Sequence, residues 1–319
     1  MSTTAKWLLA AAALVILGLV IFAAAMSANG WDFTKLGTQK YDTHTYQISE
    51  SFTNLSIKTT TANVLFAPSE DDSCKVVCYE QKNVEHAVSV QDGMLTVTVE
   101  DNREWYEHIG IGFQISKITV YLPQREYEDL SVINNTGNVE IPKNFAFESI
   151  TVSESTGKVT CYACASRGIK LKASTGNIQV KNTSAGSLDL STTTGSVTVS
   201  GVDCAGDAKV KVSTGSVKLT DVTCESLTSK GSTGSITLTN VIASEAFSIK
   251  TDTGSVRFDS CDASEIYVQT DTGSVTGTLL SDKVFFAESD TGSISVPKTT
   301  YGGRCEVTTD TGDIKLKIQ

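Results

Sequence analysis

Apolar and polar residues alternate in a pattern that repeats along most of the chain. Val or Ile stands two positions after the glycine of every repeated Thr-Gly pair, and apolar residues usually stand five and seven positions before it. Strict alternation predicts a strand with one face inward and one face in water. Each repeat therefore predicts two short strands that meet at a Thr-Gly corner.

The Thr-Gly pairs recur every 19 or 20 residues, which identifies an internal repeat. A single repeat buries too little apolar surface to fold alone, so the repeats are expected to stack as coils. Glycine suits the corner because it adopts positive φ angles without steric cost. The sequence thus predicts an all-β fold, a parallel β-solenoid (β-helix) of about ten coils over residues 129–319. The corner glycines are Gly137, Gly157, Gly176, Gly195, Gly215, Gly234, Gly254, Gly273, Gly292 and Gly312.

Residues 46–128 carry the same pattern in a decayed form. Leu55, Ile57, Val64 and Phe66 take the apolar positions of an early coil, and Ala62 stands in place of the corner glycine. Solenoids need an atypical terminal unit to close the end of the core. We therefore expect this region to be a degenerate β-repeat cap.

The N-terminal segment 7–26 contains no charged residue and is long enough for a helix to cross a hydrocarbon core of about 30 Å. Ala23 and Ala25 could serve a signal peptidase, but the apolar run is longer than that of most cleaved signals, which favours an anchor. Lys6 favours a cytoplasmic tail of residues 1–6. We predict a single-pass protein of the cell membrane, with residues 27–45 as a linker and an extracytoplasmic C-terminal region.

The formal net charge of −10 argues against nucleic acid as a partner, because phosphates attract concentrated Lys and Arg. The chain contains no basic tract. The expected partners are the membrane, through the N-terminal helix, and a cell-envelope polymer, peptide or envelope protein.

Three segments carry a resemblance to a known family. They are residues 55–64 (LSIKTTTANV), residues 117–123 (KITVYLP) and the repeated Ser-Thr-Gly-Ser-Val corners. With them, the chain resembles the bacterial putative-adhesin family of β-strand-repeat envelope proteins, a domain of unknown function in Gram-positive envelopes. The resemblance implies an envelope location and a binding or stress-related role, and it supplies no catalytic residues.

An Asp precedes the Thr-Gly pair in each of the last four repeats. Asp-Thr-Gly also marks aspartic proteases, where two carboxylates share a proton. Here the Asp exchanges with Ser213 and Thr193 at the same repeat position, so we interpret it as a corner residue that bonds a nearby amide. No cofactor is predicted, but carboxylates stacked about 4.8 Å apart leave a Ca²⁺ ladder as an alternative. The residues are Asp252, Asp271, Asp290 and Asp310.

Eight cysteines form an even set, as in proteins of oxidising compartments. Cys204 and Cys224 each stand nine positions after a corner glycine on successive repeats, which predicts neighbouring Cα atoms and a disulfide. Buried free thiols are the alternative. The close pairs at positions 161 and 164 and at 74 and 78 have metal-like spacing, but no histidine stands near either pair, so no metal site is predicted.

The alternation breaks between residues 102 and 116, a stretch that contains Trp105, Tyr106 and Phe113. Packing inside the cap is one interpretation of these aromatics. An exposed patch for an envelope partner is the other, and it supplies the candidate binding residues.

The sequence favours a non-catalytic adhesin or an envelope binding or stress-sensing module. The alternative is a structural spacer or self-associating envelope element, and residues 314–318 (IKLKI) are expected to form its last edge, where outward lysines discourage pairing. A polysaccharide-active β-helix enzyme is the third possibility. It is the least favoured, because only Arg257 and Arg304 accompany the carboxylates of the last coils.

Overall fold

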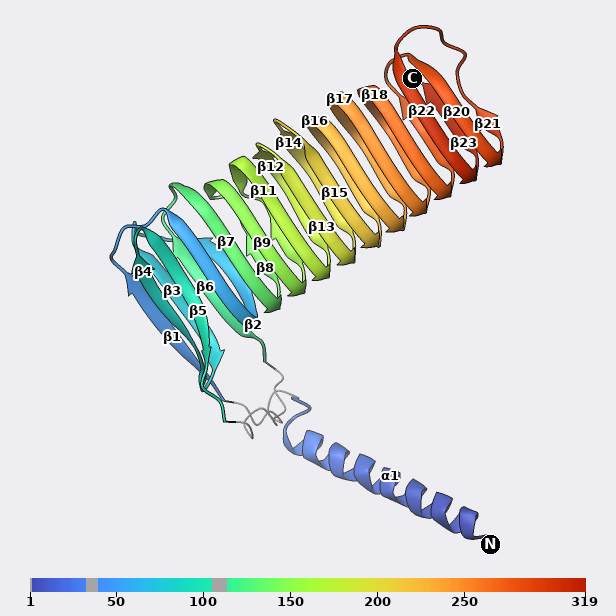
Figure 1. Ribbon diagram of the computed structural model, residues 1–319. Helices are drawn as coiled ribbons and strands as arrows, with labels where there is room; N and C mark the ends of the chain where they lie inside the picture. The colour runs from blue at the N-terminus through green and yellow to red at the C-terminus, as the bar shows by residue number, and fades with distance from the viewer. Residues whose placement is uncertain (1, 33–39, 105–113) are drawn as a thin grey trace.

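The computed structural model describes residues 2–32, 40–104 and 114–319, in which one helix precedes a long stack of strands (Figure 1). The elements are α1 (Thr3–Ala28), β1 (Tyr41–Ile48), β2 (Asn54–Pro68), β3 (Cys74–Gln81), β4 (Val84–Gln91), β5 (Met94–Asp101), β6 (Ser116–Leu122), β7 (Glu126–Thr136), β8 (Val139–Ile141), β9 (Ala146–Thr156), β10 (Val159–Cys161), β11 (Cys164–Thr175), β12 (Ile178–Ala185), β13 (Leu188–Thr194), β14 (Val197–Cys204), β15 (Ala208–Thr214), β16 (Val217–Thr233), β17 (Ile236–Thr253), β18 (Val256–Thr272), β19 (Val275–Leu279), β20 (Lys283–Thr291), β21 (Ile294–Ser295), β22 (Gly303–Thr311) and β23 (Ile314–Ile318).

The helix α1 forms from the apolar N-terminal run. Ser2 caps it by accepting the backbone N–H of Ala5 at 3.3 Å. The helix starts at Thr3, inside the predicted tail 1–6, and is long and apolar enough to cross a membrane. The strand β1 starts at Tyr41, inside the predicted linker 27–45.

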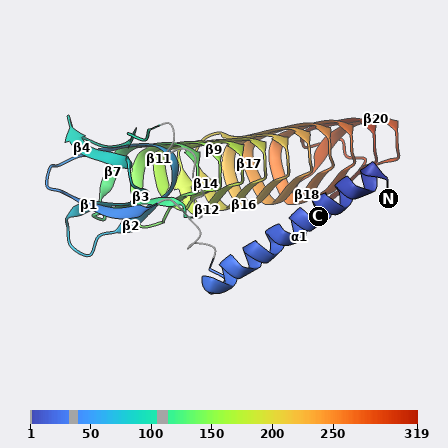
Figure 2. The ribbon, with the colours of Figure 1, turned by 90° about the horizontal axis from the view of Figure 1, so that it is seen from below.

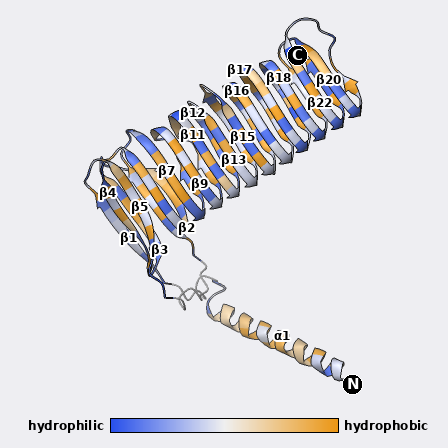
Figure 3. Ribbon diagram, viewed as in Figure 1, coloured by the Kyte–Doolittle hydropathy of each residue, from blue (hydrophilic) through white to orange (hydrophobic). Residues whose placement is uncertain are grey.

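The parallel β-solenoid is confirmed by the strand register. On the side before each corner, Leu130 of β7 pairs with Ile150 of β9 in parallel. On the side after it, Val139 of β8 pairs with Val159 of β10, which pairs with Ile178 of β12. These inward residues are buried, while their neighbours along the strands face water, so apolar and polar bands alternate along each strand (Figure 3). The core is a column of apolar rows that runs the length of the stack.

A third side continues each coil beyond the second strand. Val202, Val222 and Val241 stand seven positions after their corner glycines, pair in register from coil to coil and are buried. The third row of valines closes the column opposite the Thr-Gly corner.

The cap contains the predicted early coil and two layers that cover it. Leu55 of β2 pairs with Leu130, and Val64 pairs with Val139, which confirms that Ala62 stands in place of a corner glycine. On the other side of β2, its first half pairs with β5 and its second half with β6. The strands β4, β3 and β1 then add in antiparallel fashion (Figure 2). Antiparallel strands thus close the N-terminal end of the core.

The order of the last coils in space differs from their order in the chain. In β18, Ile266 pairs with Cys305 of β22, and Cys305 pairs on its other side with Phe285 of β20. Likewise β23 lies between β19 and β21. The final segment is therefore inserted into the stack, and the prediction that residues 314–318 form the last edge is wrong. The last coil in space consists of β20 and β21.

The Thr-Gly corner brings neighbouring coils closer than any residue with a Cβ allows. The corner glycines have φ angles between 136° and 158°. A Cβ built on any of them would lie 1.5 to 2.2 Å from a carbonyl oxygen of the adjacent coil. The same approach lets the glycine N–H bond the next coil, as Gly215 does with the Thr233 carbonyl at 2.9 Å. Glycine is therefore required at the corner by both its φ angle and its lack of a side chain.

Gly234→Ala is expected to lower the free energy of unfolding by at least about 2 kcal/mol, because the new Cβ would meet the Gly215 carbonyl oxygen at a positive φ. Gly231→Ala in the same coil is the control, since its Cβ would have no neighbour closer than 3.4 Å. That control is expected to change stability by less than about 1 kcal/mol. Denaturant unfolding of the full chain in detergent, followed by circular dichroism, measures both, and equal losses would contradict the argument.

In several coils the residue three positions before the corner glycine points inward and bonds the corner of the preceding coil in the stack. The Thr192 hydroxyl donates to the Gly176 carbonyl at 3.0 Å, and Thr270 donates to the Gly254 carbonyl at 3.1 Å. These hydrogen bonds satisfy a carbonyl that the sharp corner turns away from the strand ladder. A hydroxyl at this position can therefore satisfy the carbonyl, but it is not required, since other coils have Ala173, Val212 or Gly231 there.

Glu154 occupies this inward position in its coil and is only 2% exposed. Burial raises the pKa of its carboxyl from the ordinary 4.5 to about 7, and the nearby Asn134 amide and Thr156 backbone N–H oppose this shift only in part. A protonated carboxyl is a hydrogen-bond donor, like the threonine hydroxyls of the other coils. The neutral acid is thus the form that suits this position.

The stability of the protein is expected to fall as pH rises between about 5 and 7, because the folded state binds the Glu154 proton more tightly than the unfolded state does. The effect reaches up to about 3 kcal/mol above pH 7. Glu154→Gln keeps a donor without a charge, so it should stabilise the protein at pH 8 and have little effect at pH 5. Melting temperatures of both proteins across this range test the prediction, and parallel pH profiles would refute it.

Candidate functional site

A second corner lies on the third side of the coils, six positions after the glycine. The residues there adopt left-handed backbone angles, with φ between 49° and 61°. Asn, Asp and Gly tolerate this conformation better than other residues, which explains most of the residue types at the second corner. The positions are Asn182, Gly201, Asp221, Asn240 and Ser260.

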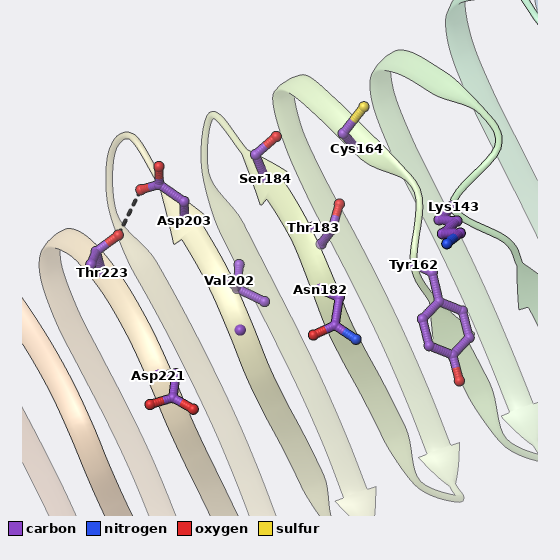
Figure 4. A pocket seen from close by; sticks show the side chains of 11 residues that line it. Lys143, Tyr162, Cys164, Asn182, Thr183, Ser184, Val202, Asp203, Asp221 and Thr223 are labelled. Atoms are coloured by element: carbon purple, nitrogen blue, oxygen red, sulfur yellow. Dashed lines mark hydrogen bonds between the residues drawn. The ribbon is translucent and has the colours of Figure 1, made fainter.

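An open groove of 760 Å³ crosses several coils beside this second corner. Its lining comes from the turns after β8 and β10 and from β12, β14 and β16 (Figure 4). Gly201 contributes no side chain, and a Cβ there would lie 2.8 Å from the Asn182 Oδ1. The row of corner side chains is therefore interrupted at Gly201 within the groove.

The two ends of the groove carry different kinds of side chain. Lys143 and Tyr162 lie together at one end, and Asp203 and Asp221 lie at the other (Figure 4). The polar side chains of Thr183 and its neighbours lie between them. The groove therefore offers a cation and an aromatic ring at one end and hydrogen-bond acceptors at the other.

Hydrogen bonds between coils fix the acidic end. The Thr223 hydroxyl donates to Asp203 Oδ1 at 2.6 Å, and the Asn240 amide donates to Asp221 Oδ1 at 2.7 Å. Preorganised acceptors lose little entropy when a ligand binds. This end is suited to recognise hydroxyl or amide groups.

The groove presents hydrogen-bonding groups together with two carboxylates and one lysine. Among the described residues that line it, none is a histidine or an arginine. Arg304, one of the two arginines considered for polysaccharide cleavage, bonds Glu306 at 2.7 Å and stacks over the Phe286 ring. Its guanidinium is thus engaged away from the groove.

The predicted aromatic residues Trp105, Tyr106 and Phe113 lie outside the described residues. Their role as a binding patch stays a prediction.

The acidic corners stack in the order Asp252, Asp271, Asp310 and Asp290, because the final segment is inserted. In the described part of the chain, their carboxylates form no hydrogen bond or ion pair. The Ca²⁺ ladder stays a prediction, with this corrected order.

Cys204 and Cys224 lie on adjacent coils, are both buried and are free thiols in the structure. Burial raises the pKa of the Cys224 thiol to about 12, which makes it unreactive as a nucleophile. Their predicted disulfide stays a prediction.

The groove residues were not identified from the sequence. A signal was nevertheless present, since Asn182, Gly201, Asp221 and Asn240 recur at one repeat position, and their types favour positive φ. Such a row predicts a second corner. The groove at that corner depends on the longer side chains of Tyr162 and its neighbours, which follow no repeat.

The fold is shared with solved structures from other bacteria. A crystal structure of a "putative adhesin" from Parabacteroides merdae is 16% identical, covers 77% of this chain and 98% of its own, and has a TM-score of 0.50. A second from Parabacteroides distasonis is 16% identical, covers 76% and 98%, and also has a TM-score of 0.50. Likeness at this identity shows the fold alone. No curated protein sequence matches the chain significantly.

The model of one protein family matches residues 52–211 and 205–319, which together include every coil and the cap except β1. The match begins with the early coil of β2 and ends with the inserted final segment. This chain belongs to the Toastrack DUF4097 family.

Proposed function

We propose that this protein is a membrane-anchored binding module that works outside the cytoplasm, with α1 as an uncleaved anchor. The groove on the third side is its binding surface, and an extended cell-envelope glycan is its ligand. The adhesins of similar fold and the apolar N-terminal helix support this general role. Stress sensing would follow from ligand binding, and the proposed binding function does not depend on it.

The observation that carries the proposal is the arrangement of the groove across the coils. Its polar side chains come from successive coils, which stack at about 4.8 Å. A linear polymer that lies across the coils would therefore meet new hydrogen-bonding groups at regular intervals. A polyhydroxylated chain fits best, because its hydroxyls can donate to Asp203 and Asp221 and pack on the Tyr162 ring.

Tyr162→Ala and Asp221→Asn are each expected to weaken binding to insoluble cell-wall glycan by about fivefold, or about 1 kcal/mol. Asn retains tolerance for the left-handed angle at position 221, so the corner should be preserved. Co-sedimentation of the full-length protein in detergent with purified wall material measures the bound fraction.

Asp252→Asn is the matched control, because it removes an exposed carboxylate from the Thr-Gly corner, outside the groove. It should bind as the wild-type protein does. Equal binding by all four proteins would eliminate the groove as the site, and absence of wild-type binding would eliminate the glycan.

A second candidate function, self-association, is favoured by the last coil in space. In the described structure, β20 pairs only with β22, so its other edge is open. Ile294 of β21 is 46% exposed and Phe286 of β20 is 49% exposed. The lysines of β23, expected to protect the edge, lie one coil inside. An open edge with apolar residues favours pairing with the same edge of another copy.

Sedimentation of the full-length protein in detergent is expected to show a weak dimer that dissociates on dilution. Ile294→Lys should weaken the dimer by about tenfold, because it places a charge on the open edge. Ile133→Lys is the control, since Ile133 is equally exposed, at 45%, but lies on a side face of the stack. A wild-type protein that stays monomeric at every concentration would exclude self-association.

A further inference from the structure

A buried polar cluster lies in the cap, far from the groove. In β3, Cys74, Val76, Cys78 and Glu80 alternate with outward residues and are all buried. Glu80 is 1% exposed, and a carboxylate in an apolar row requires partners that compensate for its lost hydration. The residues that contact Glu80 therefore indicate the chemistry of the cluster.

Two histidines from other strands meet this carboxylate. His44 Nδ1 of β1 lies 2.7 Å from Glu80 Oε1, and His86 Nδ1 of β4 lies 2.5 Å from Glu80 Oε2. The His86 backbone N–H also donates to Oε2 at 2.9 Å. The two hydrogen bonds from His86 and the one from His44 outweigh the effect of burial and leave the pKa of Glu80 below its ordinary value.

A thiol completes the set of donor atoms. The ligand atoms of Cys78, Glu80 and His86 all lie within 4.8 Å of one another, and all three residues are buried. Cys78 also pairs in register with His44 across the β1–β3 ladder. Thiolate, imidazole and carboxylate are the ligand types that Zn²⁺ prefers in proteins.

The surroundings orient these groups as metal ligands are commonly oriented. The second ring nitrogen of His86, Nε2, lies 2.9 Å from the Thr59 hydroxyl of β2. An outer hydrogen bond of this kind fixes the orientation of a histidine whose other nitrogen binds a metal. A cavity of 400 Å³ is lined by His86 and Thr59, on the Nε2 side of the His86 ring.

We propose that Cys78, Glu80 and His86 form a binding site for one divalent transition-metal ion of the Zn²⁺ class, and that His44, which contacts Glu80 from β1, moves in to complete it. The ion would take the place of the Nδ1 protons that hold the imidazoles to the carboxylate, and each neutral ring would then carry its proton on Nε2, which in His86 faces the Thr59 hydroxyl. The donor atoms would separate to about 3.3 Å, the edge of a tetrahedron with Zn–N and Zn–O bonds. Cys78 loses its thiol proton to solvent on binding. The ion would fasten β1, β3 and β4 together and so stabilise the cap.

The test uses the full-length protein in detergent, stripped with a chelator and kept reduced. Titration with Zn²⁺ against a chromogenic competitor should show one equivalent bound, and Zn²⁺ should raise the melting temperature. Co²⁺ should give a thiolate-to-metal charge-transfer band. Cys78→Ser should abolish this band and weaken Zn²⁺ binding by at least about tenfold. His44→Ala should also weaken Zn²⁺ binding, and it should leave the protein folded because the His44 side chain is 41% exposed.

Cys74→Ser is the matched control, because Cys74 is buried on the same face of the same strand but lies outside the cluster. It should retain the band and the affinity. The proposal is overturned if the wild-type protein binds no stoichiometric Zn²⁺, or if Cys78→Ser and Cys74→Ser behave alike. In either case the cluster is a hydrogen-bonded network that packs the cap and nothing more.

Discussion

The contact between successive corner glycines sets the spacing on which the rest of the structure depends. Each glycine lies so close to the carbonyl of the next coil that a Cβ would overlap it. Parallel strands in neighbouring coils form their hydrogen bonds only at a separation of about 4.8 Å. A wider corner would tilt one coil away from the next, and the apolar rows on both flanking sides would separate. The Thr-Gly pair is thus a packing requirement that recurs because every coil meets it.

The second corner accepts more residue types than the glycine corner does. Polar side chains of different kinds therefore occur on the third side of the coils. A left-handed residue with a short polar side chain is enough there, so Asn182, Asp221 and Ser260 all serve. These side chains project outward and bond between coils, as Asn240 does with Asp221. A binding surface can therefore change on this side without disturbing the spacing set at the glycine corner. The position of the groove follows from this freedom.

The regular coils could be predicted from the sequence because their determinants are local. Alternation identifies the inward residues, and the Thr-Gly pair marks the corner. In the first coil Ala62 replaces the glycine, and the alternation alone still locates the corner. The order of the last coils could not be predicted, because Ile294 and Ile314 stand at the same repeat position and either would fit against Val275. Only the contacts of the whole coils decide between them.

The candidate sites, like the order of the last coils, could be predicted from the sequence only in part. The alternation of β3 places Glu80 inward, so a buried carboxylate could have been recognised from the sequence. Its partner His44 could not, because it is 36 positions away on another strand. His86 is only six positions from Glu80, but the alternation of β3 and β4 does not show that its ring reaches the carboxylate. Long-range pairing in the cap follows no repeat. The part of the molecule with the most distinctive chemistry is therefore the part that the repeat predicts least.

The inserted final segment also makes the two ends of the solenoid different in kind. At the N-terminal end, antiparallel strands and a satisfied polar cluster cover the core. At the other end, among the residues that the structure describes, β20 and β21 pair only with β22 and β23, which follow them in the chain. The last coil in space thus has no template until the end of the chain has docked on β18 and β19. Its order then depends on the inserted coil, because β20 and β21 have strand partners on one side alone in the described structure.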